Sequence, residues 1–370
     1  MSAENVAVAV VVGATGVAGR ALCKVLIERG RSVVGVSRRT PSDIEGVRPV
    51  LVDLADSDAV RRELTGIRPD EVYFTAWTRQ PTEVENILVN GRMVRDVLEV
   101  LTAAGSLRHV ALVTGLKHYM GPFETYGTGE VRDTPFHEDE PRLSIENFYY
   151  AQEDELWESA AKNGFAWSVH RSHTIIGAAL GNAMNMGMTI AVQAALCRHQ
   201  GMPFIFPGNE VQWNGLTDMT DAGLLARHMV WAASTEGAAN QAYNIANGDL
   251  FRWRWMWPRL AQLLDVEPGP YRDGARPLVQ QMSGMAPVWA QIAQQHDLVD
   301  SDLDRVASWW HTDGDLNRPI ECFTDMTRSR KAGFTDTAST LDSFAALFAE
   351  LQQGRTIPAL PDRRPHHQLQ

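Results

Sequence analysis

The chain of 370 residues is long enough to bury a full hydrophobic core and to form more than one lobe. Its 44% hydrophobic and 21% charged residues are ordinary for a soluble globular protein. The formal net charge of -11 argues against nucleic acid as a partner, because proteins that bind it need a basic surface. We therefore expect a soluble, cytoplasmic protein.

The cysteines Cys23, Cys197 and Cys322 are far apart and show no CxxC spacing. They predict reduced thiols rather than a disulfide framework or a zinc site, and we expect no metal. The apolar run near the N-terminus lacks a basic segment and is interrupted by a glycine turn, so it predicts a strand rather than a signal peptide. Since no stretch approaches the ~20 apolar residues of a membrane helix, we expect no membrane partner.

Strand and helix patterns alternate along the first half of the chain. The run of valine and alanine at 6–12 is typical of a strand that is covered on both faces of a parallel sheet. In chain order, the pattern predicts strands at 6–12, 32–37, 50–53, 71–76, 109–114 and 166–170, and helices from Gly19 to about 29 and at 56–64, 83–104 and 145–162. This alternation implies right-handed βαβ units, and therefore an α/β fold with a Rossmann-type, doubly wound parallel sheet.

A glycine pattern, Gly13-x-x-Gly16-x-x-Gly19, joins the first strand to the first helix. Gly13 permits a tight turn, Gly16 lets the backbone approach a pyrophosphate, and Gly19 lets helix and strand pack closely. The helix N-terminus adds partial positive charge. In this strand–turn–helix context the pattern predicts a dinucleotide site rather than a glycine-rich turn without a ligand.

The second strand ends in Ser37-Arg38-Arg39, where an NAD enzyme would carry an acid for the ribose 2′-hydroxyl. Two guanidiniums suit a 2′-phosphate instead, so we expect NADP(H); the alternative is a solvated basic pair. The other residues expected to line the cofactor are Thr15, Val17, Asp53, Leu54, Thr75, Ala76, Trp77, Thr114, Gly115, Thr174 and Ile175.

The sequence changes character near residue 176, where methionine and tryptophan become frequent. We expect residues 1–175 to form mainly the NADP-binding Rossmann domain. Residues 176–358 are expected to form mainly a smaller substrate-covering lobe, interleaved with the last strands of the sheet. Residues 359–370 are expected to be a tail.

The fifth strand leads into Lys117, and the helix after a long loop begins with NFYYAQED. In open α/β sheets, chemistry takes place outside the carboxyl ends of the strands. Short-chain dehydrogenases normally carry a tyrosine and a lysine four residues apart on one helix. Here the residues four positions after Tyr149 and Tyr150 are Glu153 and Asp154, so that arrangement is absent.

The chain resembles the progesterone 5β-reductase and iridoid synthase-like family, which are atypical extended short-chain dehydrogenases that reduce activated C=C bonds in enones and enals. The resemblance covers nearly the whole chain. It rests on GATGVAG, SRRT, FTAW, TGLKHYMGPFETYG, PRLSIENFYYAQEDEL, WSVHR, WNGLTDMTDA, AYNIANGDLFRW, SWW and ECFTDMTRSRKAGF. The KHYMGPF and NFYY blocks are the most specific to this family.

The resemblance implies that Lys117 and Tyr149 are catalytic and that Phe123 lines the substrate pocket. Hydride addition to the β-carbon of an enone builds negative charge on the carbonyl oxygen. A tyrosine hydroxyl can stabilise this enolate as an oxyanion-hole donor, and a lysine ammonium favours phenolate character in the tyrosine. The α-carbon then takes its proton from water.

The residues alone do not choose between Tyr149 and Tyr150, which point away from each other on a helix; the resemblance chooses Tyr149. His118 and Tyr119 are expected to support the loop rather than to catalyse. The acids of FHEDEP are expected to form a solvated face.

Two positions depart from the family pattern. Ser172-His173 stands where the family has proline after its arginine, in a segment expected near the nicotinamide amide. His311 follows Trp309-Trp310 where the family has a phenylalanine that walls the substrate pocket. We expect His311 to make the pocket more polar, which argues against a bulky steroid preference.

The sequence leaves two alternative functions open. The same residues could serve a carbonyl or imine reductase with Tyr149 as proton donor, or the chain could be a non-catalytic NADP(H)-binding sensor. The expected partner is a small unsaturated carbonyl compound. The identity of that compound, the face of hydride attack and the formation of a homodimer are left open by the sequence.

Overall fold

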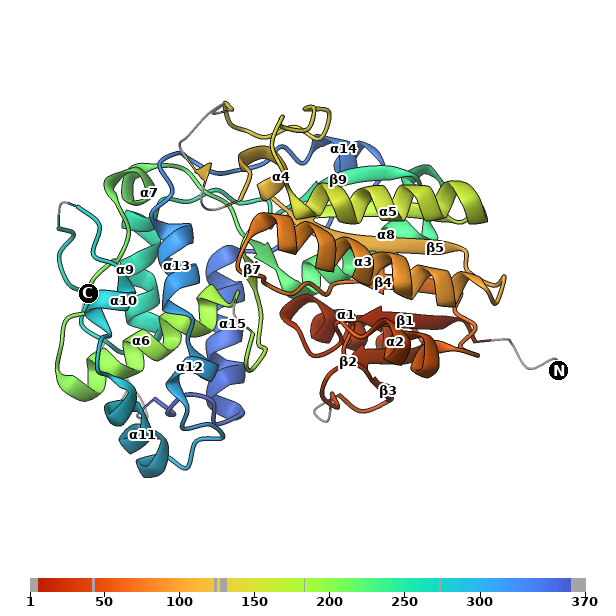
Figure 1. The fold of residues 1–370 in the computed structure, drawn as a ribbon. Coiled ribbons are helices and arrows are strands. Elements are labelled where there is room, and N and C mark those ends of the chain that lie inside the picture. Colours follow the sequence, from red (N-terminus) through yellow and green to blue (C-terminus); the bar gives the residue numbers. More distant parts are fainter. Residues whose placement is uncertain are drawn as a thin grey trace. The chain divides into compact units, whose positions relative to one another are not determined.

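The computed structural model describes residues 6–41, 44–122, 125–126, 132–182, 184–272 and 274–360 (Figure 1). The chain forms two compact units. The first comprises Met1–Ile175, Asp218–Asp249 and Cys322–Ala338, and the second comprises Ile176–Thr217, Leu250–Glu321 and Ser339–Gln370.

The first unit is built on a seven-stranded sheet in the order β3-β2-β1-β4-β5-β6-β9. Its strands are β1 (Val8–Val12), β2 (Ser32–Ser37), β3 (Val47–Leu51), β4 (Glu71–Phe74), β5 (His109–Gly115), β6 (Ala166–Ser172) and β9 (Gln241–Ile245). Every neighbouring pair is parallel. The strand order reverses between β1 and β4, which is the switch point where open α/β sheets bind ligands. The predicted doubly wound Rossmann-type fold is confirmed.

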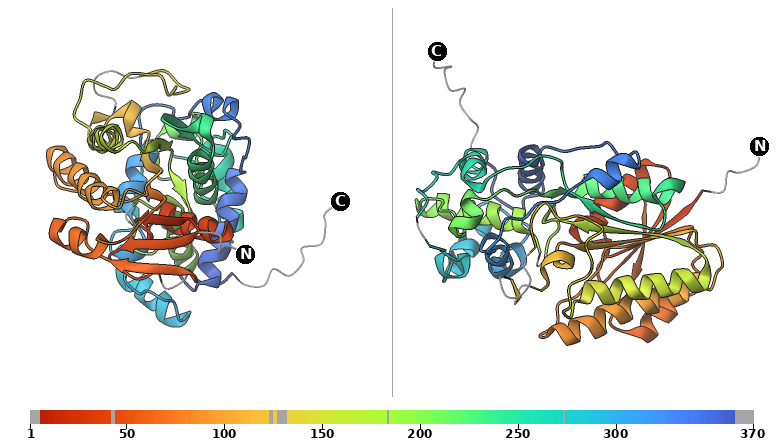
Figure 2. Two further views of the ribbon diagram at one scale, coloured as in Figure 1. Left: turned by 90° about the vertical axis from the view of Figure 1, so that its right-hand side faces the viewer. Right: turned by 90° about the horizontal axis from the view of Figure 1, so that it is seen from above.

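Helices cover both faces of this sheet (Figure 2). One face carries α2 (Ser57–Leu64), α3 (Glu83–Thr102) and α5 (Phe148–Asn163), and the other carries α1 (Val17–Glu28) and α8 (Ala222–Ser234). The first unit also contains α4 (Lys117–Met120), η2 (Glu236–Ala238) and α14 (Thr327–Lys331). A small second sheet pairs β7 (Ile175–Ile176) with β8 (Thr220–Asp221).

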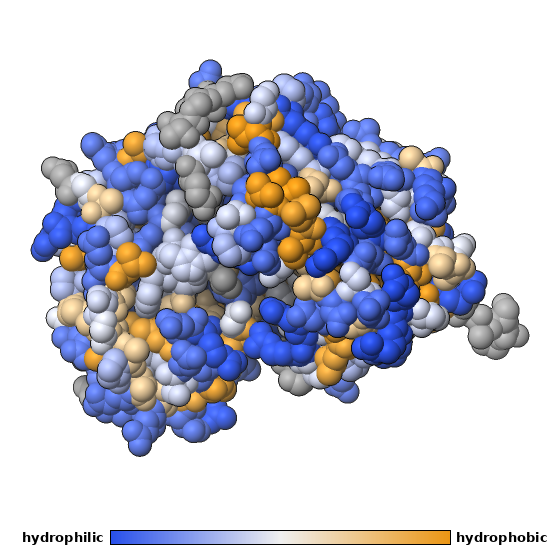
Figure 3. All heavy atoms as spheres, in the orientation of Figure 1, coloured by the Kyte–Doolittle hydropathy of each residue, from blue (hydrophilic) through white to orange (hydrophobic). Residues whose placement is uncertain are grey.

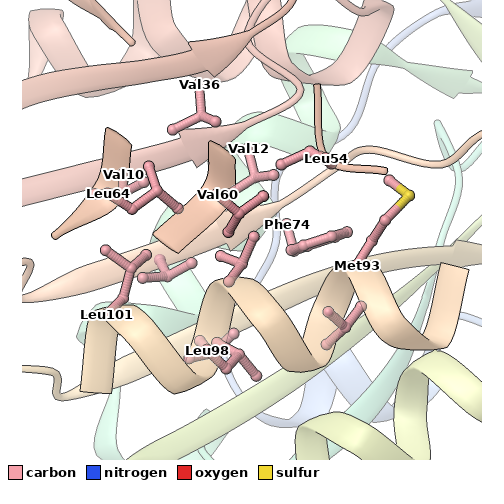
Figure 4. Close-up of a cluster of buried hydrophobic side chains, with 14 of the residues drawn as sticks. Val10, Val12, Val36, Leu54, Val60, Leu64, Phe74, Met93, Leu98 and Leu101 are labelled. Carbon is pink, nitrogen blue, oxygen red and sulfur yellow. The ribbon is translucent and has the colours of Figure 1, made fainter. Parts of the chain in front are cut away.

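Alternation along the strands explains the two helical layers. Val10 and Val12 face α3, where they join Phe74, Leu98 and Leu101 in a buried cluster (Figure 4). The alternate residues of β1, Ala9 and Val11, face the α1 and α8 side. A buried Val, Leu or Phe side chain contributes roughly 1.5–3 kcal/mol, so this double-sided burial fixes the register of β1.

The second unit is mostly helical. Its helices are α6 (Met186–Gln200), α7 (Glu210–Asn214), α9 (Trp253–Leu263), α10 (Leu278–Gln281), α11 (Ala286–Gln295), α12 (Leu303–Val306), α13 (Trp309–Leu316) and α15 (Thr340–Gln353). Trp257 stacks on Phe204 with a centroid separation of 4.1 Å, and its indole N–H donates to the Phe204 carbonyl at 3.0 Å. Helix α9, which carries Trp257, is therefore held mainly by packing.

Several element boundaries differ from the predicted ones. The third strand is Val47–Leu51 rather than 50–53, and the fourth ends at Phe74. After Phe74, the backbone N–H and the hydroxyl of Thr75 both bond the Val12 carbonyl, at 2.9 and 2.8 Å. The loop predicted after Gly115 begins with the single helical turn α4, which ends at Gly121 with a φ of +77°. A positive φ favours glycine, so the turn stops there.

The described residues contain no helix that is long and apolar enough to cross a membrane. The face drawn in Figure 3 is mostly hydrophilic, with one group of hydrophobic side chains near its upper centre and smaller ones scattered elsewhere. Single exposed apolar side chains are normal on a protein surface and carry no functional argument.

A chain of three buried histidines lies on the α8 side of the sheet. His109 Nε2 and His170 Nε2 each lie 2.9 Å from the hydroxyl of Ser168, and His170 Nδ1 lies 2.8 Å from His228 Nδ1. Burial lowers the pKa of His109 to about 4 and that of His228 to about 3. All three rings are therefore neutral near pH 7.

We expect these histidines to make the protein acid-sensitive. Their folded-state pKa values lie below the unfolded value of 6.5, so stability is complete above pH 6.5 and is lost as the pH falls toward about 4. Each histidine contributes a slope of about 1.4 kcal/mol per pH unit in that window. Urea unfolding at pH 7.5, 6.0 and 5.0 measures the loss. His109→Gln, which keeps a hydrogen-bonding group, should reduce the loss at pH 5 by roughly 2 kcal/mol.

The exposed His296 provides the control, because His296→Gln should leave the pH dependence of the unfolding free energy unchanged. An unchanged pH dependence in His109→Gln would show that the buried chain does not cause the acid sensitivity.

Candidate active site

The glycine turn after β1 is packed so closely that side chains are excluded. Gly13 has a φ of +93°, and a Cβ there would lie 2.8 Å from Thr75 Oγ1; a Cβ on Gly19 would lie 2.2 Å from the Gly13 carbonyl. Helix α1 begins after Gly16 and carries no acidic residue in its first turn. Its first backbone N–H groups and its dipole can therefore receive an anion such as a pyrophosphate.

The end of β2 lies beside this turn, because Gly13 N–H donates to the Val36 carbonyl at 2.9 Å. Arg38 and Arg39 follow the strand and are exposed, and the buried Ser37 hydroxyl bonds the Arg39 carbonyl at 2.5 Å. The two guanidiniums thus stand at the carboxyl edge of the sheet, in solvent, where a ligand phosphate can reach them. The Asp53 carboxylate accepts from Ala55 N–H at 3.0 Å and so shapes the turn after β3.

Lys117 lies against two aromatic rings. Trp77, which follows β4, stacks on Phe148 with a centroid separation of 5.4 Å and an interplanar angle of 19°. The Lys117 ammonium lies 5.6 Å from the Trp77 ring and 5.3 Å from the Phe148 ring. Cation–π attraction at these distances holds the ammonium against the two rings.

Asn147 and Tyr150 tie the backbone around Lys117 to the start of α5. The Asn147 amide donates to the Lys117 carbonyl at 2.7 Å, and its oxygen caps α5 by accepting from Tyr149 N–H at 3.0 Å. The Tyr150 hydroxyl donates to the His118 carbonyl at 2.6 Å and accepts from Leu143 N–H at 3.0 Å. Tyr150 therefore has a structural role, and burial raises the pKa of its hydroxyl.

Tyr149 lies over the end of β5. Its hydroxyl is 3.4 Å from the position that a Cβ on Gly115 would take, and the Ser172 carbonyl is 2.9 Å from the same position. A side chain at Gly115 would displace the strand end, so glycine is required there. Tyr149 and Lys117 thus both lie at the carboxyl edge of β5, the edge at which the glycine turn follows β1.

His118 and Tyr119 are buried beneath this edge. The Tyr119 hydroxyl donates to Asn244 Oδ1 at 2.6 Å, and burial raises its pKa to about 12. Burial, together with the nearby Arg171, lowers the pKa of His118 to about 2. Neither group exchanges a proton near neutral pH.

One expectation about the acids of FHEDEP is wrong. Glu138 is buried, and its carboxylate accepts from Asn244 N–H at 3.1 Å. The reason is that the strand β9, far along the chain, supplies a donor that local sequence cannot reveal.

Ser172 and His173 form specific contacts. The Ser172 hydroxyl donates to the Thr114 carbonyl at 3.1 Å. His173 Nδ1 lies 2.6 Å from Asp218 Oδ1, and the other oxygen of Asp218 accepts from the Thr324 N–H and hydroxyl, each at 2.8 Å. These bonds hold the segment that precedes Thr174 and Ile175. Sequence reasoning did not identify Asp218, because its partners lie in distant parts of the chain.

Two residues predicted to contact the substrate, Phe123 and His311, remain predictions. Phe123 lies outside the described residues. His311 is buried on α13 of the second unit, with its Nδ1 atom 3.9 Å from Asp315 Oδ2. No cluster of three or more histidine, cysteine or acidic side chains that could hold a metal occurs in the described part of the chain.

The chain matches a known protein family. Residues 9–246 match the model of the NAD dependent epimerase/dehydratase family. UDP-glucose 4-epimerase from Thermotoga maritima has a similar structure, with a TM-score of 0.67 and 14% identity, covering 94% of this chain and 99% of that chain. At this identity the likeness shows the fold alone.

Closer relatives are similar along nearly their whole length. The (S)-8-oxocitronellyl enol synthase of Camptotheca acuminata is 35% identical over 367 residues, which cover 95% of this chain and 93% of the relative. The 3-oxo-Delta(4,5)-steroid 5-beta-reductase of Arabidopsis thaliana is 35% identical over 364 residues, with the same two coverages. The chain therefore belongs to the NAD dependent epimerase/dehydratase family and, within it, to the progesterone 5β-reductase and iridoid synthase-like enzymes.

Proposed function

We propose that this protein is an NADPH-dependent ene-reductase, which reduces the activated C=C bond of α,β-unsaturated carbonyl compounds. The observation that carries the proposal is the convergence of Lys117 and Tyr149 at the carboxyl edge of β5, the edge that also carries the glycine turn. The names of the relatives, an enol synthase and a steroid 5-beta-reductase, support the same reaction class.

The residues present fit a nicotinamide dinucleotide. The turn from Gly13 to Gly19 leaves no space for a Cβ at either glycine, so the backbone there is open to a ligand. The N-terminus of α1 can bind a pyrophosphate. The exposed guanidiniums of Arg38 and Arg39 suit a 2′-phosphate, which supports NADP(H) over NAD(H). When bound, the cofactor supplies the hydride.

Tyr149 and Lys117 supply the electrostatic part of the reaction. The Tyr149 hydroxyl donates a hydrogen bond to the substrate carbonyl oxygen as negative charge builds there. The Lys117 ammonium, held by the Trp77 and Phe148 rings, stabilises negative charge on the tyrosine oxygen. Water protonates the α-carbon, so no further acid is needed.

Product analysis tests the reaction class. NADPH oxidation is measured with small cyclic enones, linear enals and steroid enones, and the products are identified. We expect a saturated compound that keeps its carbonyl group. An allylic alcohol would contradict the proposal in favour of a carbonyl reductase, and tight NADPH binding without oxidation across the panel would favour a sensor.

Replacing the proposed oxyanion donor tests the site. Tyr149→Phe should lower kcat by roughly 10²–10³-fold, the usual effect of removing one such donor, while the KM for NADPH changes little. Tyr150→Phe is the matched control, because it also removes a tyrosine hydroxyl from α5, but one that binds the His118 carbonyl. The variant leaves that carbonyl without its buried hydrogen-bond donor. It should lower the unfolding free energy by about 1–3 kcal/mol and kcat by less than tenfold. Equal losses of kcat in the two variants would contradict the assignment of Tyr149.

The two arginines test the choice of cofactor. Arg38→Ala and Arg39→Ala should each raise the KM for NADPH by roughly 10–100-fold, because a charge-assisted contact to the 2′-phosphate is lost, and should leave the KM for NADH unchanged. Arg48→Ala is the control, because Arg48 is an exposed arginine on the neighbouring strand β3. It should change neither the KM for NADPH nor the KM for NADH. Parallel changes with both cofactors would argue against a 2′-phosphate site.

A further inference from the structure

Helix α5 buries a carboxylate one turn beyond Tyr149. Glu153 has an exposed fraction of 0% and stands four residues after Tyr149, on the same face of the helix. This is the position at which other short-chain dehydrogenases carry their lysine. An acid in place of a base, fully out of water, needs compensating charge to remain ionised.

Three groups from different segments face this carboxylate. Arg142, before α5, donates to Glu153 Oε2 at 3.0 Å. Arg171 on β6 and His118 on α4 lie 3.7 and 3.8 Å from Glu153 Oε1. The Glu153 side chain therefore lies between the strand that pairs with β5 and the turn that carries Lys117.

Arg171 depends on Glu153 for its charge balance. Its guanidinium is buried, and its hydrogen bonds go to neutral groups, the Tyr119 hydroxyl and the Glu138 carbonyl, each at 3.2 Å. Within the described residues, Glu153 is the carboxylate that forms an ion pair with it. Without Glu153, a positive charge would remain buried next to the end of β5, because Arg171 pairs in register with Thr114.

Other charged and titratable groups surround this centre. Asp154 on α5 holds the other nitrogen of Arg142 at 2.8 Å, and Arg132 pairs with Glu140 at 2.8 Å. The hydroxyls of Tyr119 and Tyr150 and the carboxylate of Glu138 lie in the same region. Their pKa values are raised by burial, so all three keep their protons more strongly than when exposed.

Resting on the proposed function, we propose that Glu153 is a positioning residue for the reaction. Its carboxylate neutralises Arg171, so that Lys117 supplies the positive charge that acts on the Tyr149 hydroxyl. Glu153 touches neither substrate nor cofactor in this role. It sets the pH at which Tyr149 loses its proton.

Glu153→Gln tests this role through the pH profile. The variant keeps the shape but leaves Arg171 without its counter-ion, and the added positive charge favours the phenolate of Tyr149. In general, one unit charge acting over roughly 10 Å at an effective dielectric constant of ~20 shifts a pKa by on the order of one unit. The basic limb of the kcat profile should therefore move to lower pH by about one unit.

Two further variants change the charge in defined ways. Arg171→Gln, which leaves Glu153 with less compensation, should move the basic limb to higher pH, and Glu153→Gln/Arg171→Gln should return it toward the wild-type position. Asp154→Asn is the matched control, because Asp154 also binds Arg142 but is exposed, whereas the ion pair of Arg171 is with Glu153. It should leave the profile unchanged.

A purely structural role for Glu153 predicts a lower Tm with an unshifted pH profile, and that result overturns the proposal. If Glu153→Gln does not fold, the opposite shift in Arg171→Gln decides, and its absence overturns the proposal as well. Phenolate absorbance near 295 nm, measured with Tyr149→Phe as the reference, follows the Tyr149 pKa without turnover. The proposal can thus be tested even if the wild type reduces no enone, a result that would refute the proposed function alone.

Discussion

The side chain of Asn147 is the contact on which the arrangement of the site depends. One end caps α5 at the N–H of Tyr149, and the other donates to the carbonyl of Lys117. This amide, together with the Tyr150 hydroxyl, fixes the start of the tyrosine helix relative to the turn that carries the lysine. Where both residues stand on one helix, the backbone sets their spacing; here a side-chain bridge sets it. An aspartate could cap the helix equally well, but it could not donate to the carbonyl.

The sequence was sufficient to predict six of the seven strands of the sheet, all but β9, because their signals are local. Runs of valine mark strands that are covered on both faces, and Gly13 and Gly19 mark a turn that no other residue could form. Strand ends were less predictable. The apolar pattern continues to Ala76, but the strand stops at Phe74, where the Thr75 hydroxyl bonds the neighbouring strand. Hydrophobic periodicity reports which residues are buried, not where the ladder of hydrogen bonds ends.

The residues of the candidate site were likewise predictable only in part. Lys117 and Tyr149 could be named from short motifs, but the helix was expected to begin at residue 145, so the N-cap role of Asn147 was missed. The buried acidic residues could not be identified from the sequence. Glu153 resembles any helical acid in sequence, and Glu138 and Asp218 each have a partner 106 residues away, Asn244 and Thr324. Burial of an acid is a property of the tertiary structure, so composition favoured the wrong, solvated interpretation of Glu138.

Placing the lysine outside the tyrosine helix has an electrostatic consequence. In the four-residue arrangement the lysine follows the tyrosine by one helical turn and lies on the same face of the helix. Here the same helical position is acidic, and its charge opposes that of Lys117 unless a cation cancels it. Arg171 and Arg142 provide positive charge next to it, at 3.7 and 3.0 Å from its two carboxylate oxygens. Burying such ions costs several kcal/mol each in desolvation, and removing one partner leaves the other uncompensated. The position of Lys117 on the turn after β5 therefore requires a neutralised interior beneath it.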